Sequence, residues 1–218
     1  LHSIGIVRRE KPETLSHTLQ DCIANNMQLH FVSREEYDKQ NKAHYLQTLQ
    51  QQYSNAIIIP EGGYDSLGSK GASLIADSIN DNLYTHICLA VGTATTLSGI
   101  LQKVNCKVIA IPILKGMKDI EDRIYELTQK KFTPDKLIIW DNYHFGGYAK
   151  RTKQLIDFIN NCWTKYTLPL DFVYTAKAFY GILENIRMDY FPKNSNILFL
   201  HTGGLQGNLS LPPKTLLF

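Results

Sequence analysis

Residues 83–91 read LYTHICLAV, and residues 92–99 continue as GTATTLSG. The first segment is an apolar run rich in branched side chains, which predicts a buried strand. The second is a turn of small and hydroxyl-bearing residues that leads into an apolar helical pattern at Leu97, Ile100 and Leu101. Such a turn leaves backbone N–H groups at the start of a helix without partners, and the helix dipole favours negative charge there. The pattern predicts a phosphate-binding cradle, with an ordinary strand-to-helix turn as the alternative.

Apolar runs of this kind alternate with helical patterns along the whole chain. Strands are predicted at residues 4–7, 28–33, 56–60, 83–91, 107–114, 136–140 and 196–200, and helices at residues 14–25, 34–52, 72–79, 118–130, 152–166 and 178–189. This alternation predicts βαβ units and an α/β fold with mostly parallel sheets covered by helices. A glycine-rich connection at residues 60–71 places a domain boundary near Ile59, which gives a small domain at 1–58 and a large one at 59–218.

The composition describes a globular protein that can bury a sizeable core. Of its 218 residues, 44% are hydrophobic and 20% are charged, and no apolar run approaches the length of a membrane span. The net charge is +3, with dispersed basic residues, so neither nucleic acid nor membrane is predicted as a partner. The four cysteines form no CxxC pair, which indicates neither a metal site nor a disulfide framework and favours a cytoplasmic protein.

Four loops are expected to carry the function, because ligands of open α/β sheets bind at the carboxyl ends of the strands. They are the cradle at Gly92 and the loops at Glu61, His144 and Thr202. The chain contains no GxGxxG at its first βα turn and no Walker-type loop, so a dinucleotide or a nucleoside triphosphate is not favoured.

Seven segments together resemble one enzyme family, that of 1-aminocyclopropane-1-carboxylate deaminase and D-cysteine desulfhydrase. These enzymes depend on pyridoxal 5'-phosphate and have fold type II, similar to the tryptophan synthase β subunit. The segments follow one another in the family's order from the first residue nearly to the last: 4–8, 15–19, 59–63, 91–96, 143–150, 173–177 and 201–204. The resemblance implies two three-layer α/β/α domains, of which residues 1–58 form part of the small one and residues 59–218 form the large cofactor-binding one.

The resemblance also implies roles for individual residues. The phosphate of the cofactor would be held by the backbone of Gly92, Thr93, Ala94, Thr95 and Thr96. Thr175 and Thr202 would lie near the pyridine nitrogen, and Tyr174 would be a proton-transfer or positioning group. Glu61, Gly62 and Gly147 would line the wall that faces a small amino-acid substrate. A homodimer is implied in the same way.

Taken alone, several of these residues have simpler interpretations. Tyr174 is then a core or surface tyrosine, and Thr175 is an N-cap of the following helix. His144 orders its own loop, and His201 has no partner spaced for metal or triad chemistry. Lys70, Lys150 and Lys177 are expected to be solvated.

One departure from the family concerns the lysine that forms the Schiff base with the cofactor. In the family this lysine lies upstream of the segment that resembles residues 4–8, as does a Ser-Asn-His segment, and neither is in this sequence. We therefore expect this chain to be the C-terminal major part of a longer enzyme, with an incomplete small domain and no turnover by itself.

For the complete enzyme, the expected reaction converts a small amino acid to ammonia and an oxo acid. Ring-opening deaminases have a carboxylate where this chain has Thr175, so β-elimination from a D-amino acid such as D-cysteine is favoured over cyclopropane opening. Two other classes stay open: a noncatalytic protein that binds a phosphate or pyridoxal phosphate, and an enzyme that binds a phosphosugar through the same cradle.

Overall fold

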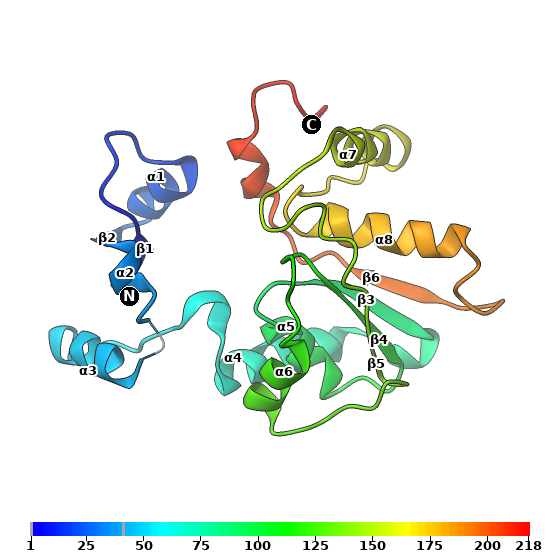
Figure 1. Cartoon of the computed structure of the whole chain (residues 1–218), viewed down its shortest axis with the longest axis horizontal. Coiled ribbons are helices and arrows are strands. Elements are labelled where there is room, and N and C mark those ends of the chain that lie inside the picture. The colour runs from blue at the N-terminus through cyan, green and yellow to red at the C-terminus, as the bar shows by residue number, and fades with distance from the viewer. Residues whose placement is uncertain (1, 41) are drawn as a thin grey trace. The chain divides into compact units, whose positions relative to one another are not determined.

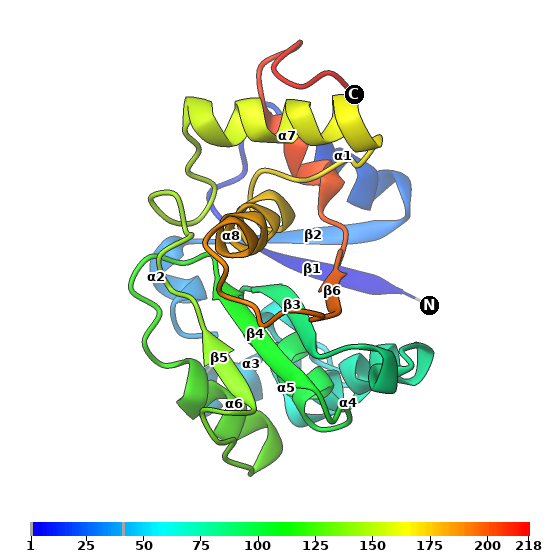
Figure 2. The ribbon, with the colours of Figure 1, turned by 90° about the vertical axis from the view of Figure 1, so that its right-hand side faces the viewer.

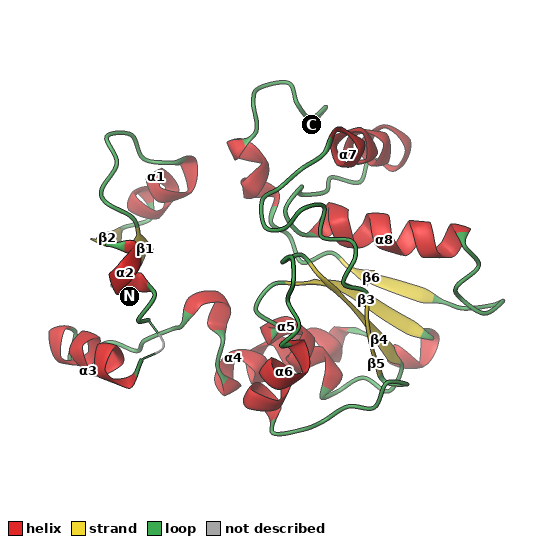
Figure 3. Ribbon diagram, viewed as in Figure 1, coloured by secondary structure: helices red, strands yellow, loops and turns green. Residues whose placement is uncertain are grey.

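The structure is a computed structural model that describes residues 2–40 and 42–218. Two compact units meet in the sequence between Pro60 and Glu61, and each contains its own parallel sheet. Figure 1 gives the order of the elements along the chain, and Figure 3 distinguishes the strands from the helices. Among the described residues, no helix combines the length and the apolar character that crossing a lipid bilayer requires.

The first unit is a single βαβ motif followed by two helices. Its strands pair in parallel, with Ser3 opposite Met27 and Arg8 opposite Val32. Among the described residues of this unit, only Val32 and Leu49 are buried hydrophobic side chains, so its core is small. The elements are β1 (Ser3–Arg8), α1 (His17–Ala24), β2 (Met27–Val32), α2 (Arg34–Tyr37) and α3 (Ala43–Gln52).

Two sequence predictions are wrong in this unit. The helix predicted over residues 34–52 is two helices, α2 and α3, and position 41 of the segment between them lies outside the described residues. The strand predicted over residues 56–60 is absent, and Ile57 and Ile59 are 89% and 78% exposed. A short apolar run becomes a strand only where a neighbouring strand supplies hydrogen bonds and a core covers its side chains, and neither exists here.

The second unit is built on a four-stranded parallel sheet with the order β5-β4-β3-β6 (Figure 2). Strand β3 lies inside the sheet, where Cys88 pairs with Ile109 on one side and with Phe199 on the other. Because all four strands run in the same direction, the loops that follow β3, β5 and β6 leave from the same edge. The strands are β3 (His86–Val91), β4 (Lys107–Pro112), β5 (Leu137–Ile139) and β6 (Ile197–Leu200).

Helices cover both faces of this sheet, as the alternation of side chains along a strand requires. Ile87 and Leu89 of β3 belong to the core with α5 and α6, whereas Cys88 between them packs in the core with α8. The helices and 3-10 helices are η1 (Glu61–Gly63), α4 (Ser66–Ser73), η2 (Leu74–Ser78), η3 (Asp81–Leu83), α5 (Thr95–Leu101), α6 (Ile120–Thr128), α7 (Lys153–Tyr166), α8 (Thr175–Arg187) and η4 (Leu205–Ser210).

The cysteines of this unit lie in or beside its cores. Cys88 and Cys162 are buried, and burial raises the pKa of the Cys88 thiol to about 12 and that of Cys162 to about 11. Both side chains are free thiols that stay protonated at neutral pH.

Helix α4 begins inside the stretch that the sequence predicts to be a glycine-rich connection. The Asp65 carboxylate caps it by accepting a hydrogen bond from the Gly68 amide at 2.5 Å. The helix then crosses α5 so closely that a Cβ added to Gly99 would lie 2.6 Å from the Ser69 carbonyl oxygen. The glycines and serines of this stretch therefore allow two helices to approach each other, in addition to connecting the two units.

Replacing Gly99 tests this crossing. We expect Gly99→Ala to lower the free energy of unfolding by about 1 to 3 kcal/mol, because two backbones must separate to admit a methyl group. Gly71→Ala is the matched control: it lies in α4 with open space around its Cβ position, so it should raise stability by about 0.5 to 1 kcal/mol. Urea unfolding followed by tryptophan fluorescence measures both, since Trp140 and Trp163 lie in this unit. Equal effects of the two substitutions would contradict the close crossing.

Candidate functional site

The cradle occupies the turn between β3 and α5. Ala94 has a φ of 74°, a left-handed conformation that costs an alanine about 1 kcal/mol. The first backbone bond of the helix runs from the Ser98 amide to the Ala94 carbonyl, so the amides of residues 95–97 have no partner within the helix. The hydroxyls of Thr93 and Thr95 bond to each other at 2.9 Å. Unpaired amides and strain at one turn are typical of a ligand site.

Two other predicted site segments lie against this turn. Gly62 approaches the Thr93 side chain so closely that an added Cβ would lie 2.6 Å from it, and Gly62 has a φ of 66° that favours glycine. On another side, a Cβ added to Gly92 would lie 3.2 Å from the Tyr174 ring. The structure therefore brings Glu61, Gly62 and Tyr174 to the cradle, although the segment at Glu61 follows no strand.

Tyr174 stands between the cradle and the loop at residues 141–150. Its ring packs edge-on against that of Tyr148, with centroids 6.0 Å apart. Burial raises the pKa of Tyr174 above its usual value, and Tyr148, Asp171 and Glu61 raise it further. The hydroxyl of Tyr174 is therefore protonated at neutral pH.

Thr175 follows Tyr174 but faces the interior. Its side chain is fully buried, and its hydroxyl donates to Asp171 Oδ1 at 2.7 Å and accepts from the Asp171 amide at 2.9 Å. The N-cap position of α8 belongs to Tyr174, so the interpretation of Thr175 as the cap is wrong. The predicted contact of Thr175 with a pyridine nitrogen stays a prediction.

Sequence reasoning missed Asp171, which organises this turn. Its buried carboxylate accepts from the amides of Val173 and Tyr174 at Oδ2 and from that of Thr175 at Oδ1, each at 2.8 Å. A carboxylate close before an apolar helical pattern is a capping signal.

Thr202 is exposed in the loop after β6. Among the described residues, no hydrogen bond joins it to the other predicted site residues. The same loop reaches the turn through Gly204, where an added Cβ would lie 3.2 Å from the Asp171 carboxylate. The loop after β6 is thus brought to the start of α8 by its glycine.

The loop after β5 contains Gly147, whose carbonyl accepts a hydrogen bond from Lys177 Nζ at 2.7 Å. Lys177 is fully buried, so its prediction as a solvated lysine is wrong: its place in α8 turns it toward the interior. Burial lowers its pKa to about 8, although the Asp171 charge acts in the opposite direction. In the same loop, His144 Nδ1 accepts from the Gly146 amide, which confirms that His144 orders the loop.

A scan against models of protein families gives no match. A protein of Pyrococcus furiosus named as a candidate 1-aminocyclopropane-1-carboxylate deaminase is 27% identical over 99% of this chain and 70% of its own length. A bifunctional D-cysteine desulfhydrase/1-aminocyclopropane-1-carboxylate deaminase of Arabidopsis thaliana, named as mitochondrial, is 28% identical over 95% of this chain and 57% of its own. The chain resembles these enzymes along most of its length. The resemblance inferred from the sequence is therefore confirmed.

A further relative and two solved structures complete this comparison. The D-cysteine desulfhydrase of Yersinia pestis is 25% identical over 72% of this chain and 53% of its own. A crystal structure described as that of an ACC deaminase homologue superposes with a TM-score of 0.77 at 23% identity, over 95% of this chain and 67% of its own. That of O-ureido-L-serine synthase gives 0.58 at 13% identity, over 96% and 67%. These likenesses show the fold and confirm the predicted α/β class with parallel sheets. The chain spans 53 to 70% of the length of the relatives named here.

Thr175→Val tests the buried pair with Asp171. The substitution keeps the shape but removes a hydroxyl that both donates and accepts, so we expect the free energy of unfolding to fall by about 1 to 3 kcal/mol. Thr164→Val is the matched control, because Thr164 is exposed on α7 and bonds only to the Asn160 carbonyl; its effect should stay below about 0.5 kcal/mol. Urea titration of both variants measures the difference. If Thr175→Val lowered the free energy of unfolding by no more than Thr164→Val, the result would contradict a buried hydrogen bond between Thr175 and Asp171.

The titration of Lys177 predicts how stability depends on pH. Burial favours the neutral form, so between pH 8 and about 10.5 the unfolded chain binds more protons than the folded protein, and the free energy of unfolding rises with pH. At about 1.4 kcal/mol per pH unit, the full gain is about 3 kcal/mol. The free energy of unfolding of the wild type minus that of Lys177→Met should therefore increase over this range. A difference that stays constant from pH 7 to 10.5 would show that Lys177 titrates normally.

Proposed function

We propose that the protein is a pyridoxal 5'-phosphate-dependent enzyme that releases ammonia and an oxo acid from a small amino acid. The observation that carries the proposal is the cradle, where Gly62 and Tyr174 close around the turn that starts at Gly92. The similarity to deaminases and desulfhydrases over most of the chain supports the same conclusion. Because the chain spans only part of these relatives, the activity is proposed for the full-length protein.

The residues of the cradle fit the phosphate of this cofactor. Glycine at positions 62 and 92 lets Thr93 and Tyr174 pack directly against the backbone around the turn, and the amides of residues 95–97, which have no partner within the helix, are suitable donors to phosphate oxygens. We therefore assign phosphate binding to Gly92, Thr93, Ala94, Thr95 and Thr96. When bound, pyridoxal phosphate supplies an electron sink for reactions at the α-carbon of an amino acid.

Tyr174 is the residue that we propose to hold or move a proton at its hydroxyl. It is protonated at neutral pH because burial raises its pKa, and it lies beside both the cradle and the loop that contains Gly147. Glu61, Gly62 and Gly147 are proposed to face the substrate. Thr202 and Thr175 are proposed to lie toward the pyridine nitrogen, and a threonine at position 175 favours β-elimination from a D-amino acid such as D-cysteine over cyclopropane opening.

Two further expectations concern the whole protein. The homodimer implied by the resemblance stays a prediction, as does the cytoplasmic location. One relative, that of Arabidopsis thaliana, is named as mitochondrial.

Cofactor binding and turnover by the full-length protein test the proposal. We expect added pyridoxal phosphate to give a visible absorbance band and D-cysteine to yield sulfide. Gly62→Ala should weaken cofactor binding by about tenfold, or about 1.4 kcal/mol, because its methyl group pushes Thr93 into the cradle. Gly71→Ala should bind as the wild type does. A wild-type spectrum unchanged by pyridoxal phosphate would contradict the proposal, and binding without turnover of D-cysteine or 1-aminocyclopropane-1-carboxylate would support the noncatalytic alternative.

A further inference from the structure

Lys177 presents a charge inside the protein that the proposed reaction does not use. Its side chain has no exposed surface, and its ammonium donates to the Gly147 carbonyl at 2.7 Å. A buried ammonium is costly unless it is hydrogen-bonded, so this contact fixes where the carbonyl lies. The carbonyl also accepts from the Lys150 amide at 3.1 Å, which makes it the point where the loop closes on itself.

The loop around this carbonyl has an unusual backbone. Phe145, Gly146, Gly147 and Ala149 have φ values of 50°, 94°, 116° and 52°. Left-handed conformations are disfavoured for phenylalanine and alanine, and they persist only where the surroundings hold them. The contacts of this loop with α8 hold it in these conformations. The Phe145 ring packs on Tyr180 with centroids 5.0 Å apart, and Lys177 donates its hydrogen bond to the Gly147 carbonyl.

A short series of contacts leads from Lys177 to the cradle. Gly147 precedes Tyr148, whose ring packs edge-on against the ring of Tyr174. Tyr174 in turn contacts Gly92. Tyr148 is 57% exposed, so its own burial does not fix it, and the backbone next to it must do so.

We infer that Lys177 is a positioning residue for Tyr174: by holding the Gly147 carbonyl, it places the Tyr148 ring against the Tyr174 ring. This inference rests on the proposed function, in which the Tyr174 hydroxyl holds or moves a proton. The inferred role explains why a charged side chain is buried at this position: the Lys177 ammonium orders the loop at residues 144–150, which lies beside Tyr174.

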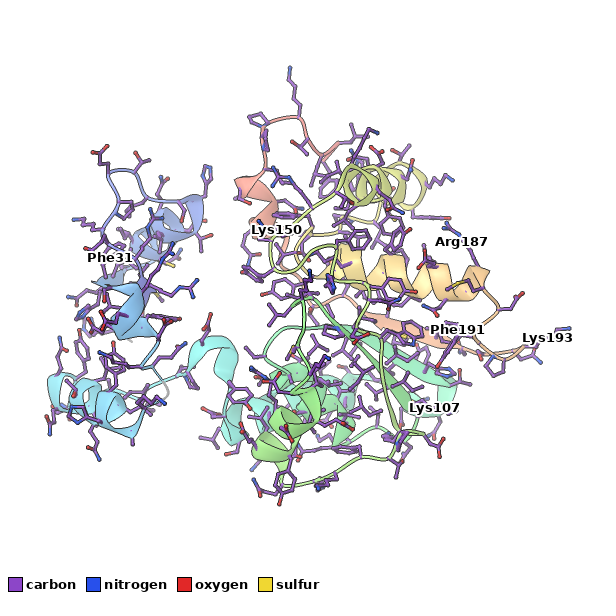
Figure 4. All side chains as sticks on the ribbon, in the orientation of Figure 1. Phe31, Lys107, Lys150, Arg187, Phe191 and Lys193 are labelled. Carbon is purple, nitrogen blue, oxygen red and sulfur yellow. The ribbon has the colours of Figure 1, made fainter. Side chains whose placement is uncertain are left out.

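Kinetics of the full-length protein with pyridoxal phosphate test the inference. Lys177→Met and Tyr148→Ala should each lower kcat by about tenfold, a fraction of what a general acid or base contributes, while the Kd for pyridoxal phosphate stays within about twofold. Since both act through Tyr174, the double variant should be no slower than the slower single variant. Lys150→Met is the control: its side chain is exposed in the same loop (Figure 4), and kcat should not change. The inference would be overturned if the kcat losses of the two single variants multiplied in the double variant, or if the Kd for pyridoxal phosphate rose by more than about twofold.

Hydrogen exchange supplies a readout that does not depend on activity. Lys177→Met should speed exchange in the peptide covering residues 144–150, where the Gly147 amide bonds to His144 and the Lys150 amide bonds to Gly147. Exchange in residues 92–101 and in the Lys150→Met control should be unchanged. Unaltered exchange at 144–150 would overturn the inference. A wild type without cofactor binding or turnover would overturn the proposed function and the role for Tyr174, while exchange would still decide whether Lys177 holds the loop.

A measurement on the native wild type covers the case in which Lys177→Met does not fold. Under reductive methylation, the exposed Lys150 should be modified and the buried Lys177 should not, as read by peptide mass spectrometry. Modification of both lysines at the same rate would overturn the inference.

Discussion

The buried carboxylate of Asp171 is the group on which the start of α8 depends. It accepts the three amides of residues 173–175 and the hydroxyl of Thr175, so its lone pairs are largely used and its charge is spread over fixed donors. The Tyr174 side chain projects from this turn toward Gly92. The loop after β6 reaches the same carboxylate through Gly204. A charge that is expensive to bury thus fixes two of the segments that surround the cradle.

Close backbone approach is the second constraint on this unit. The backbone at Gly62 packs against the Thr93 side chain, and the backbone at Gly99 packs against helix α4. At Gly181 of α8, an added Cβ would lie 2.8 Å from the Tyr143 ring. The Tyr143 hydroxyl also accepts from Asn185 at 2.8 Å, so one face of α8 receives the loop that follows β5. Packing of this kind lowers the freedom of the loops, which allows polar groups on different segments to keep defined separations.

The sequence predicted the large unit better than the small one, for a physical reason. Strands such as residues 86–91 are covered on both faces and buried at every residue except the half-buried Ala90, so their apolar character is nearly continuous and easily recognised. The run at Ile57 and Ile59 is also apolar, but no partner strand pairs with it. Within the candidate site, the cradle could be predicted because its amides belong to a local turn. The burial of Lys177 and the hydrogen bonds of Asp171 depend on contacts between residues distant in sequence or on helix orientation, which a local pattern does not contain.

The state of the two buried cysteines bears on the surroundings in which the protein can work. Cys88 lies inside β3 and Cys162 on the buried side of α7, and burial raises the pKa of both thiols far above neutral pH. Only the thiolate attacks a disulfide or is readily oxidised, so these side chains are poor reactants toward glutathione, peroxide or polysulfides. The two cysteines buried in the cores of the large unit are therefore poorly placed to respond to changes in redox potential.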